Sequence, residues 1–243
     1  LGFPLACAVV VFHPSSAPAP DGRLRIDFLD VGQGDSALIT MPTGETILFD
    51  GGGKLNFSRL SAGREGDEAE PFEPDARSVG EAVVSEFLWE KGYSRVDYMI
   101  ASHGDADHVE GLTEAARNFR VKTAFAPDGA IEGEDFGEFQ NVLRKRGVPL
   151  LTLSRGDRFS FGGAEIRVLH PAKDALERDE ASNNQSLVLR ISFGKKVFLL
   201  TGDIEKEAER ELLETPGFVR ANVVKAAHHG SRTSSTEEFV RAA

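Results

Sequence analysis

The stretch His103-Gly104-Asp105-Ala106-Asp107-His108 places four potential metal ligands within six residues. The apolar run Val96–Ala101 precedes it, which predicts a strand that delivers the motif at its carboxyl end. Two buried carboxylates this close would repel each other, and a shared cation removes that cost. Alternating imidazoles and carboxylates converge only if the backbone turns in a loop, which the small residues Gly104 and Ala106 allow. We interpret the stretch as half of a two-metal hydrolase site.

Three further polar clusters adjoin predicted strands, and four of the six histidines lie in only two motifs. Because each cluster stands at the end of an apolar run, we expect the clusters to meet in space. They are Ser182-Asn183-Asn184-Gln185-Ser186 before Leu187–Ile191, Thr201-Gly202-Asp203 after Val197–Leu200, and His228-His229-Gly230-Ser231-Arg232-Thr233 after Val223–Ala227.

Asp50 follows the predicted strand Thr46–Phe49 and is itself followed by three glycines. A carboxylate and glycines at a strand end suit a close approach of the backbone to a ligand, and a simple loop after a strand is the alternative. Residues 54–77 are polar and rich in charge, which predicts a long surface loop that could cover the site.

The order of apolar patterns predicts antiparallel hairpins first and alternating strands and helices afterwards. We expect an α/β (α+β) chain folded as an αββα sandwich. Residues Asp30–Asp35 are interpreted as a hairpin turn, because the glycines there form only part of a dinucleotide-binding pattern and lead into a strand. Further strands are predicted at 24–29, 36–41, 121–126, 148–153, 158–161 and 164–169, and helices at 79–91, 111–119, 138–146 and 205–213.

The composition of the chain excludes several kinds of site. The 243 residues, 40% of them hydrophobic, can build one compact domain. A single cysteine, Cys7, excludes a disulfide framework and a thiolate-rich zinc site. The net charge of -11 argues against a broad basic face that tracks nucleic acid. An anionic substrate would therefore be held locally, by divalent cations that reverse the sign of the site.

The first 22 residues differ from the rest. Leu1–Phe12 is apolar and residues 14–22 are rich in proline, so we place an apolar remnant and linker at 1–22 and the folded domain at 23–243. The apolar run is shorter than the roughly 20 residues that span a bilayer. It is interpreted as the end of a transmembrane helix, the remnant of a signal peptide, or a first buried strand, and either of the first two would put the domain outside the cytoplasm.

The central motif resembles the metallo-β-lactamase signature His-x-His-x-Asp-His, with Asp105 at the second histidine. With aspartate at that position, the motif resembles the one in the C-terminal hydrolase domain of ComEC-type competence proteins. These proteins are the inner-membrane channels of bacterial DNA uptake. The stretches Leu29–Ser36, Asn183–Leu189, Thr201–Asp203 and Lys225–Ser234 carry the same resemblance. It implies the αββα fold, shortened at its C-terminal end, because the family fold continues beyond the position of Ala243.

The resemblance implies two divalent metal ions. One would be held by His103 and Asp105, with Asn184 or Asn183 in place of a third histidine. The other would be held by Asp107, His108 and one of His228 and His229, with Asp203 bridging and Asp50 supporting from behind. His170 is expected to be structural rather than a ligand. A ligand set with few imidazoles makes manganese or magnesium as suitable as zinc.

The implied function is a metal-dependent phosphodiesterase or nuclease that hydrolyses DNA with a hydroxide formed between the metals. Its catalytic residues would be Asp107, Asp203, His228 and His229. Ser231, Arg232 and Thr233 would grip a phosphate, or the serines would cap a helix.

The expected partners are DNA or another phosphodiester, the membrane-channel portion of the same longer chain, and other competence proteins. The expected location is an inner-membrane protein, with this domain outside the cytoplasm. Two alternatives remain: a hydrolase of small esters, lactones or thioesters, and a scaffold domain of a membrane channel with weak catalysis or none.

Overall fold

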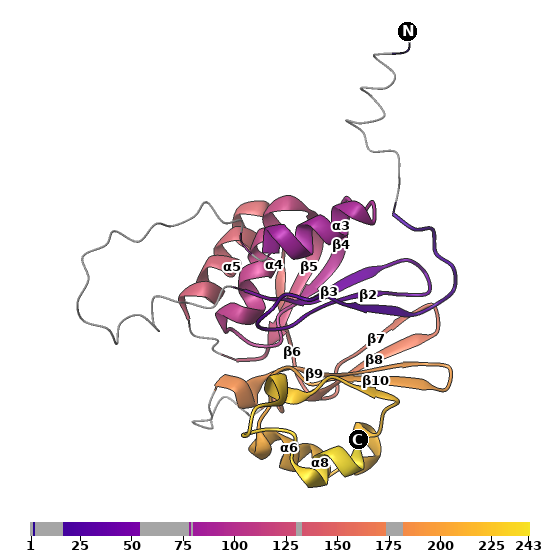
Figure 1. Ribbon diagram of the computed structural model, residues 1–243, viewed down its shortest axis with the longest axis vertical. Coiled ribbons are helices and arrows are strands. Elements are labelled where there is room, and N and C mark those ends of the chain that lie inside the picture. Colours follow the sequence, from indigo (N-terminus) through magenta and orange to yellow (C-terminus); the bar gives the residue numbers. More distant parts are fainter. Residues whose placement is uncertain (1, 3–16, 54–77, 79, 130–132, 174–181) are drawn as a thin grey trace, which may run out of the picture.

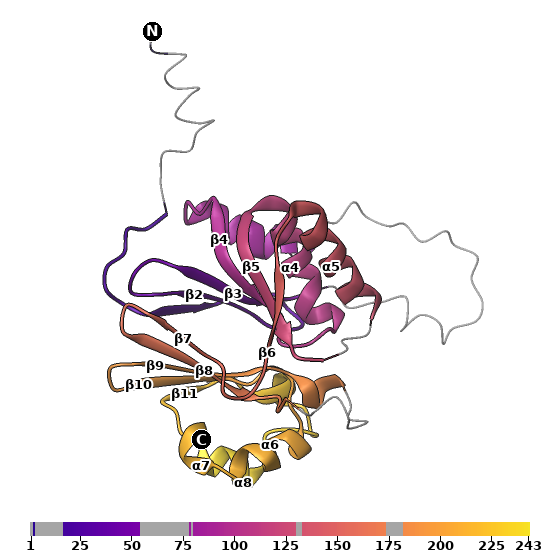
Figure 2. The ribbon, with the colours of Figure 1, turned by 180° about the vertical axis from the view of Figure 1, so that it is seen from behind.

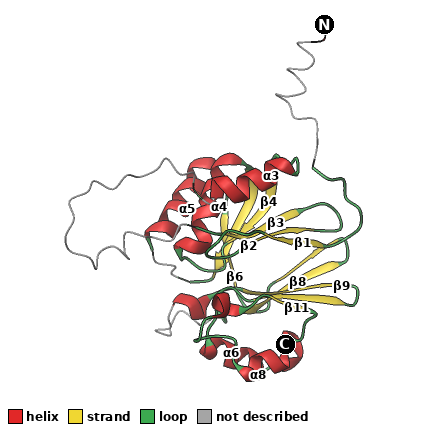
Figure 3. Ribbon diagram, viewed as in Figure 1, coloured by secondary structure: helices red, strands yellow, loops and turns green. Residues whose placement is uncertain are grey.

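Two β-sheets face each other, and helices cover the outer side of each sheet (Figures 1 and 3). The structure is a computed structural model that describes residues 2, 17–53, 78, 80–129, 133–173 and 182–243. This arrangement confirms the expected αββα sandwich.

The first sheet has six strands in the order of the sequence. β1, β2 and β3 form an antiparallel meander, whereas β3, β4, β5 and β6 run parallel to one another. Helices connect the parallel strands, as parallel pairing requires. The strands are β1 Arg25–Phe28, β2 Ser36–Thr40, β3 Thr46–Gly51, β4 Arg95–Ile100, β5 Arg120–Pro127 and β6 Leu150–Leu153.

One helical layer packs on the first sheet through apolar side chains that include Leu112 and Phe139, both fully buried. Its members are the π-helical turn η1 at Gly80–Ser85, α3 at Glu86–Glu90, α4 at Ala106–Asn118 and α5 at Glu134–Arg146. α5 ends at Gly147, whose φ of 68° supplies the left-handed residue that commonly terminates a helix.

The second sheet has the order β11-β10-β9-β8-β7. Its strands are β7 Arg158–Phe161, β8 Ala164–His170, β9 Val188–Phe193, β10 Lys196–Leu200 and β11 Val223–Val224. The short helices α6 Lys206–Leu213, α7 Pro216–Val219 and α8 Glu237–Ala242 cover its outer face (Figure 2). Two 3-10 turns, η3 at Ser182–Gln185 and η4 at Ala227–Gly230, precede β9 and follow β11.

The core between the sheets contains residues from both, among them Ile39 and Phe49 on the first sheet and Ile166 and Leu189 on the second. Alternation along each strand explains this: Leu38 and Leu48 point to the helices on the outside, while Ile39 and Phe49 point inward. The two sheets therefore meet along an apolar interface, and the polar clusters remain at the strand ends.

Most predicted elements are confirmed, with three differences. α4 begins at Ala106, so Asp107 and His108 belong to a helical turn and not to a loop. β11 is only two residues long, because the chain turns at Ala227. The helix α7 was not predicted, since four residues beside a proline give no periodic signal.

Two predictions lie largely or wholly outside the described residues. These are the loop at 54–77 and the apolar segment at the start of the chain, so the division at residues 22 and 23 stays a prediction. None of the described helices is long and apolar enough to cross a lipid bilayer.

The glycines after Asp50 pack against helix α4, which corrects the expectation that they approach a ligand. A Cβ atom on Gly51 would lie 2.3 Å from the main-chain nitrogen of Leu112, and one on Gly111 would lie 1.9 Å from the carbonyl oxygen of Gly51. The Gly111 N–H donates to the carbonyl oxygen of Gly52 at 2.9 Å. Backbone therefore touches backbone here, and this contact fixes α4 against the end of β3.

Candidate metal centre

The candidate ligands come from both sheets. His103 follows β4, and Asp107 and His108 stand in the first turn of α4, which packs on the first sheet. Asp203 follows β10 and His229 follows β11 in the second sheet. The expectation that these strand ends meet in space is confirmed by the distances between their side chains.

Four of these side chains form one compact group. Asp35, His108, Asp203 and His229 each offer a ligand atom, and these atoms lie within 4.8 Å of one another. Asp203 Oδ2 lies 3.3 Å from His108 Nε2 and 3.1 Å from His229 Nε2. Asp107 reaches the same group, with Oδ2 3.7 Å from His229 Nε2.

Asp50 anchors His108 from behind. Its Oδ2 lies 3.0 Å from His108 Nδ1, and its Oδ1 accepts a 2.7 Å hydrogen bond from the Ser102 N–H. Both side chains of this pair are fully buried. A carboxylate on Nδ1 leaves Nε2 as the ligand nitrogen and fixes the ring, which is the usual second partner of a metal-binding histidine.

His103 and Asp105 form a second group beside the first. Their Nε2 and Oδ2 atoms are 3.6 Å apart, and the His103 ring centroid lies 4.2 Å from that of His108. His103 is buried, while the Asp105 side chain is about half exposed. The two residues expected to hold one metal ion therefore lie side by side, with the side chain of Asp105 reaching toward His103 from the position before α4. That they bind a metal stays a prediction.

The structure separates the two adjacent histidines. His229 contacts Asp203 and Asp107, whereas His228 Nδ1 lies 3.1 Å from Glu205 Oε1. Both have left-handed backbone conformations, with φ of 45° for His228 and 51° for His229. Such conformations are costly for residues with a Cβ and concentrate at functional sites.

Lys225 places an ammonium group among these carboxylates. Its Nζ contacts the Asp35 carboxylate, lies 3.2 Å from Asp203 Oδ1 and donates to the carbonyl oxygen of Gly202 at 2.8 Å. Only 11% of the side chain is exposed. An ammonium group at this depth balances part of the negative charge that Asp35, Asp107 and Asp203 bring together.

The electrostatics of the metal-free centre favour charged side chains. Burial alone would lower the pKa of His108, but the Asp50 and Asp203 carboxylates raise it to about 10. Hydrogen bonds to Asp203 and Asp35 raise the pKa of His229 to about 9. Burial opposes ionisation of Asp203, yet contacts with His108, His229 and Lys225 hold its pKa far below the usual range.

The pKa shifts of Asp35 and Asp105 also favour the charged forms. Burial would raise the pKa of Asp35, but His229 and Lys225 hold it below its usual value. The close contact with the His103 imidazole is the main cause that lowers the pKa of Asp105. Without a metal, the centre is therefore a network of carboxylates paired with protonated imidazoles and one ammonium group.

The donor set fits a divalent cation. The Nε2 atoms of His103 and His108 are buried and make no aligned hydrogen bond within the described chain, although a carboxylate oxygen lies near each, from Asp105 at 3.6 Å and from Asp203 at 3.3 Å. Buried nitrogens without a partner are rare unless an ion or water completes them. With several carboxylate oxygens and few imidazoles, the set suits manganese, magnesium or zinc.

Asn184 stands in the 3-10 turn η3, and its side chain lies against the start of α6. Its Oδ1 accepts hydrogen bonds from the main-chain N–H groups of Glu205, at 2.9 Å, and Ala208, at 3.4 Å, and its Nδ2 donates to Glu207. These bonds occupy the amide, so its role as a ligand stays a prediction without support from these contacts. Asn183 is half-buried in the same 3-10 turn.

His170 is fully buried, and its Nδ1 lies 3.1 Å from the carbonyl oxygen of Ser186. This agrees with the structural role expected for it. The compact ligand group found among the described residues does not include it.

The residues expected to grip a phosphate lie on the loop after η4. Thr233 Oγ1 donates to Glu205 Oε1 at 2.7 Å and lies 3.1 Å from Ser231 Oγ. Arg232 is exposed. The alternative of a helix cap formed by the serines is wrong, because Thr236 accepts from the Phe239 N–H and caps α8.

Sequence reasoning missed Asp35, Lys225 and Glu205. Asp35 and Lys225 stand in two of the stretches that resemble the family, so the signal was present, but neither had been given a role. Asp35 was interpreted as part of a turn and Lys225 as the interior of a strand. Their place beside Asp203 depends on how the two sheets pack.

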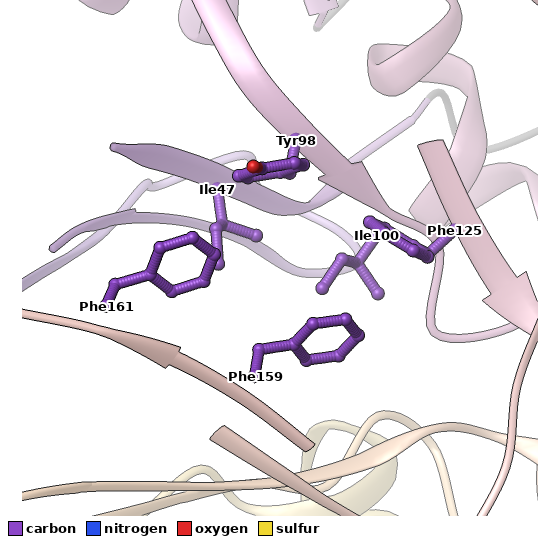
Figure 4. A pocket seen from close by; sticks show the side chains of 6 residues that line it. All are labelled: Ile47, Tyr98, Ile100, Phe125, Phe159 and Phe161. Atoms are coloured by element: carbon purple, nitrogen blue, oxygen red, sulfur yellow. The ribbon is translucent and has the colours of Figure 1, made fainter. Parts of the chain in front are cut away.

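An apolar cavity of about 230 Å³ lies between the sheets and is separate from these ligands. Figure 4 shows aromatic rings from β4, β5 and β7 directed toward one another there. Its six lining residues include one polar group, the Tyr98 hydroxyl, and no carboxylate or histidine. The cavity therefore does not provide the groups that hydrolysis needs.

Comparison with known proteins identifies the family and several relatives. A family model described as the metallo-beta-lactamase superfamily matches residues 29–243. ComE operon protein 3 of Bacillus subtilis (strain 168) is 33% identical over 237 residues, which cover 97% of this chain and 29% of that protein. Recombination protein 2 of Haemophilus influenzae is 27% identical and covers 97% of this chain and 25% of its own length.

Competence protein ComA of Neisseria gonorrhoeae is 25% identical over 98% of this chain and 28% of its own length. The chain thus spans less than a third of the length of these three relatives. Among solved structures, a subclass B3 metallo-beta-lactamase from a soil metagenome is 13% identical and covers 89% of this chain and 81% of its own, with a TM-score of 0.48.

Proposed function

The chain belongs to the metallo-beta-lactamase superfamily, and from this premise we propose that it is a metal-dependent phosphodiesterase that hydrolyses DNA during bacterial DNA uptake. The fold supports a metal-dependent hydrolase in general. The names of the relatives, a ComE operon protein, a recombination protein and a competence protein, support the choice of DNA.

The composition of the ligand group is the observation that carries the proposal. Three carboxylates, from Asp35, Asp107 and Asp203, lie there with two imidazoles, from His108 and His229. A fourth carboxylate, from Asp105, stands beside the imidazole of His103. Carboxylate oxygens favour manganese and magnesium more than an imidazole-rich site does. These ions bind phosphate oxygens well, so the donor set suits phosphodiesters better than lactams or lactones.

Two divalent cations, held by His103 and Asp105 on one side and by Asp107, His108, Asp203 and His229 on the other, would supply positive charge for the phosphate and acidify a bound water. Asp50 orients His108 through Nδ1, and the Ser102 N–H holds Asp50. This chain of contacts fixes the ligand nitrogen before substrate arrives, as an efficient site requires.

His228 is the group we assign to proton donation. Its Nδ1 is engaged with Glu205 Oε1, so Nε2 is the nitrogen left to protonate the leaving oxygen. Lys225 supplies a fixed positive charge next to Asp35 and Asp203. Charge placed before the reaction stabilises the negative charge that develops on phosphate oxygens.

We further propose that the domain acts within a longer membrane protein, on the side of the inner membrane away from the cytoplasm. The short coverage of the relatives supports a longer chain as the working unit. The channel portion of that chain and other competence proteins are the proposed partners. A neighbouring basic part would offset the net charge of -11, which is unfavourable for long-range attraction of DNA.

The test is a hydrolysis assay on the purified protein with a single-stranded oligodeoxynucleotide, a small phosphodiester and a lactone. Each is incubated with manganese, magnesium, zinc or a chelator. We expect phosphodiester cleavage that requires manganese or magnesium and disappears in the Asp105→Ala and Asp203→Ala variants.

A metal-loaded protein that opens lactones, esters or thioesters and leaves every phosphodiester intact would contradict the proposal in favour of a small-molecule hydrolase. A protein that binds no divalent cation would favour the scaffold alternative.

A further inference from the structure

Phe28 is an inward-facing residue that is left exposed. It ends β1, the edge strand of the first sheet (Figure 3), and alternates with Leu24 and Ile26, which pack against the core between the sheets. Phe28 itself is 52% exposed. Single exposed apolar side chains are ordinary on a protein surface, so the position of this ring matters more than its exposure.

That position is beside two charged groups of the candidate metal centre. Phe28 lines one small hollow together with Asp35 and Lys225, whose side chains contact each other. The floor of the hollow is apolar and comes from both sheets, with Ala37 and Phe49 from the first and Leu200 from the second. The register pairs Phe28 with Ala37. The hollow therefore runs from an aromatic rim to the charged groups that surround Asp203.

We propose that Phe28 is a stacking platform for a base of single-stranded nucleic acid whose phosphate lies at the Lys225 side of the metal centre. The inference rests on the proposed phosphodiesterase function and narrows its substrate. Phe28 acts as a positioning residue, because it contacts the base next to the reacting phosphate and not the phosphate itself.

The chemistry of the hollow selects this ligand over the alternatives. Proteins that bind single strands combine cationic groups for the backbone with exposed aromatic rings for the bases. A base in a duplex is stacked on its neighbours and cannot use such a ring without being unpaired. A small ester or lactone has no second flat group to place on Phe28 while its reacting carbon lies at the metal centre.

The experiment compares two oligodeoxynucleotides of equal length, one with normal bases and one abasic, so that only the stacking partner is removed. With the normal strand, Phe28→Ala should raise KM by about 5- to 150-fold, the range that stacking of one base represents, and leave kcat nearly unchanged. With the abasic strand, Phe28→Ala and the wild type should have the same KM. Phe28→Tyr should restore the wild-type KM.

Leu151→Ala is the matched control. Leu151 is 51% exposed on β6, the opposite edge strand of the first sheet, and does not line the hollow. A binding measurement tests the stacking contact without any hydrolysis of the strand. In Phe28→Trp, with chelator present, the normal strand should quench the new indole fluorescence and the abasic strand should not. The single natural tryptophan, Trp89, gives the background, which the wild type measures.

Equal effects of Phe28→Ala on both strands, or equal quenching by both, would overturn the inference while phosphodiesterase activity persists. If the wild type cleaves neither strand but the base-dependent quenching is present, the proposed hydrolysis fails and the stacking site stands.

Discussion

The Nζ atom of Lys225 lies 3.2 Å from Oδ1 of Asp203, so an ammonium group shares the carboxylate at the middle of the candidate metal centre. A like charge next to a cation weakens its binding through Coulomb repulsion. We therefore expect Lys225 to lower the affinity of the centre for a metal ion and to offer its own positive charge to an anionic substrate.

Lys225→Met should increase affinity for manganese by about tenfold or more, because a nearby like charge costs more than about 1.4 kcal/mol at protein-like dielectric constants. Turnover of a phosphodiester should fall in the same variant. Isothermal titration gives the affinity, and Lys206→Met, at an exposed lysine that pairs with Glu207, is the control. Unchanged affinity in Lys225→Met would show that the ammonium group does not act on the cation.

Asp203 and Asp97 allow a matched comparison, since both are buried carboxylates with ionic partners. Asp203→Asn should lower manganese affinity at least roughly 100-fold, which is the upper end for residues that only support a ligand. Asp97 accepts from the Thr46 N–H and pairs with Lys122, away from the ligand group. Asp97→Asn should cost about 1–3 kcal/mol of unfolding free energy and leave metal binding intact. A similar loss of metal in both variants would contradict the assignment of Asp203.

Alanine variants of the two adjacent histidines should differ in metal content and in turnover. His229→Ala should lose bound metal, because His229 contacts Asp203 and Asp107. His228→Ala should retain metal and lose about 100-fold or more in kcat, the size of a general-acid contribution. Metal analysis after dialysis and single-turnover kinetics check this. Loss of metal in His228→Ala alone would reverse the roles.

The metal-free protein should lose stability as the pH rises from 6.5 toward 9 and 10. The folded pKa values of His108 and His229 are raised from 6.5 to about 10 and about 9, so their stabilising contribution is complete below pH 6.5 and is lost as the pH rises through these folded values. Asp203 and Asp35 have lowered pKa values, so their contribution is present above pH 3.8 and lost below it.

Thermal unfolding with a chelator should therefore show greatest stability between pH 3.8 and 6.5. Saturating manganese displaces the imidazole protons, so its stabilising effect should grow across pH 6.5 to 9. Parallel stability curves with and without metal would contradict this coupling.

Gly111 and Gly137 both lie within helices but differ in surroundings. A Cβ on Gly111 would lie 1.9 Å from the Gly51 carbonyl oxygen, whereas a Cβ on Gly137 would meet no atom within 4 Å. Gly111→Ala should prevent correct packing of α4 and reduce soluble, metal-binding protein. Gly137→Ala should stabilise the fold by about 0.4–1 kcal/mol, because alanine restricts the unfolded chain and favours helix. Circular dichroism during thermal unfolding measures both, and equal stability of the two variants would contradict the packing argument.

The sequence predicted the sandwich and most of the centre because both depend on local patterns. Apolar runs marked the strands, and polar clusters at their ends marked His103, Asp107 and Asp203. These residues were identifiable because carboxylates and imidazoles are seldom grouped for structural reasons alone.

The rest depended on contacts between distant parts of the chain. An aspartate in a turn and a lysine in a strand are common, so Asp35 and Lys225 became informative only through their contact across the two sheets. His228 and His229 are equivalent in sequence, and two left-handed backbone conformations decide which side chain faces Asp203. The glycines after Asp50 were expected to approach a ligand, and only the structure identified helix α4 as what they touch.

The division of the ligand group between the sheets has a consequence for synthesis of the protein. Asp35 precedes the second strand, whereas Asp203 and His229 follow the tenth and eleventh. A chain emerging from the ribosome can fold its first sheet early, yet it lacks half of the ligands until residue 229 has appeared. A chain that ends within the second sheet therefore cannot assemble the group that Asp35, His108, Asp203 and His229 form, and the centre is complete only when synthesis of both sheets is.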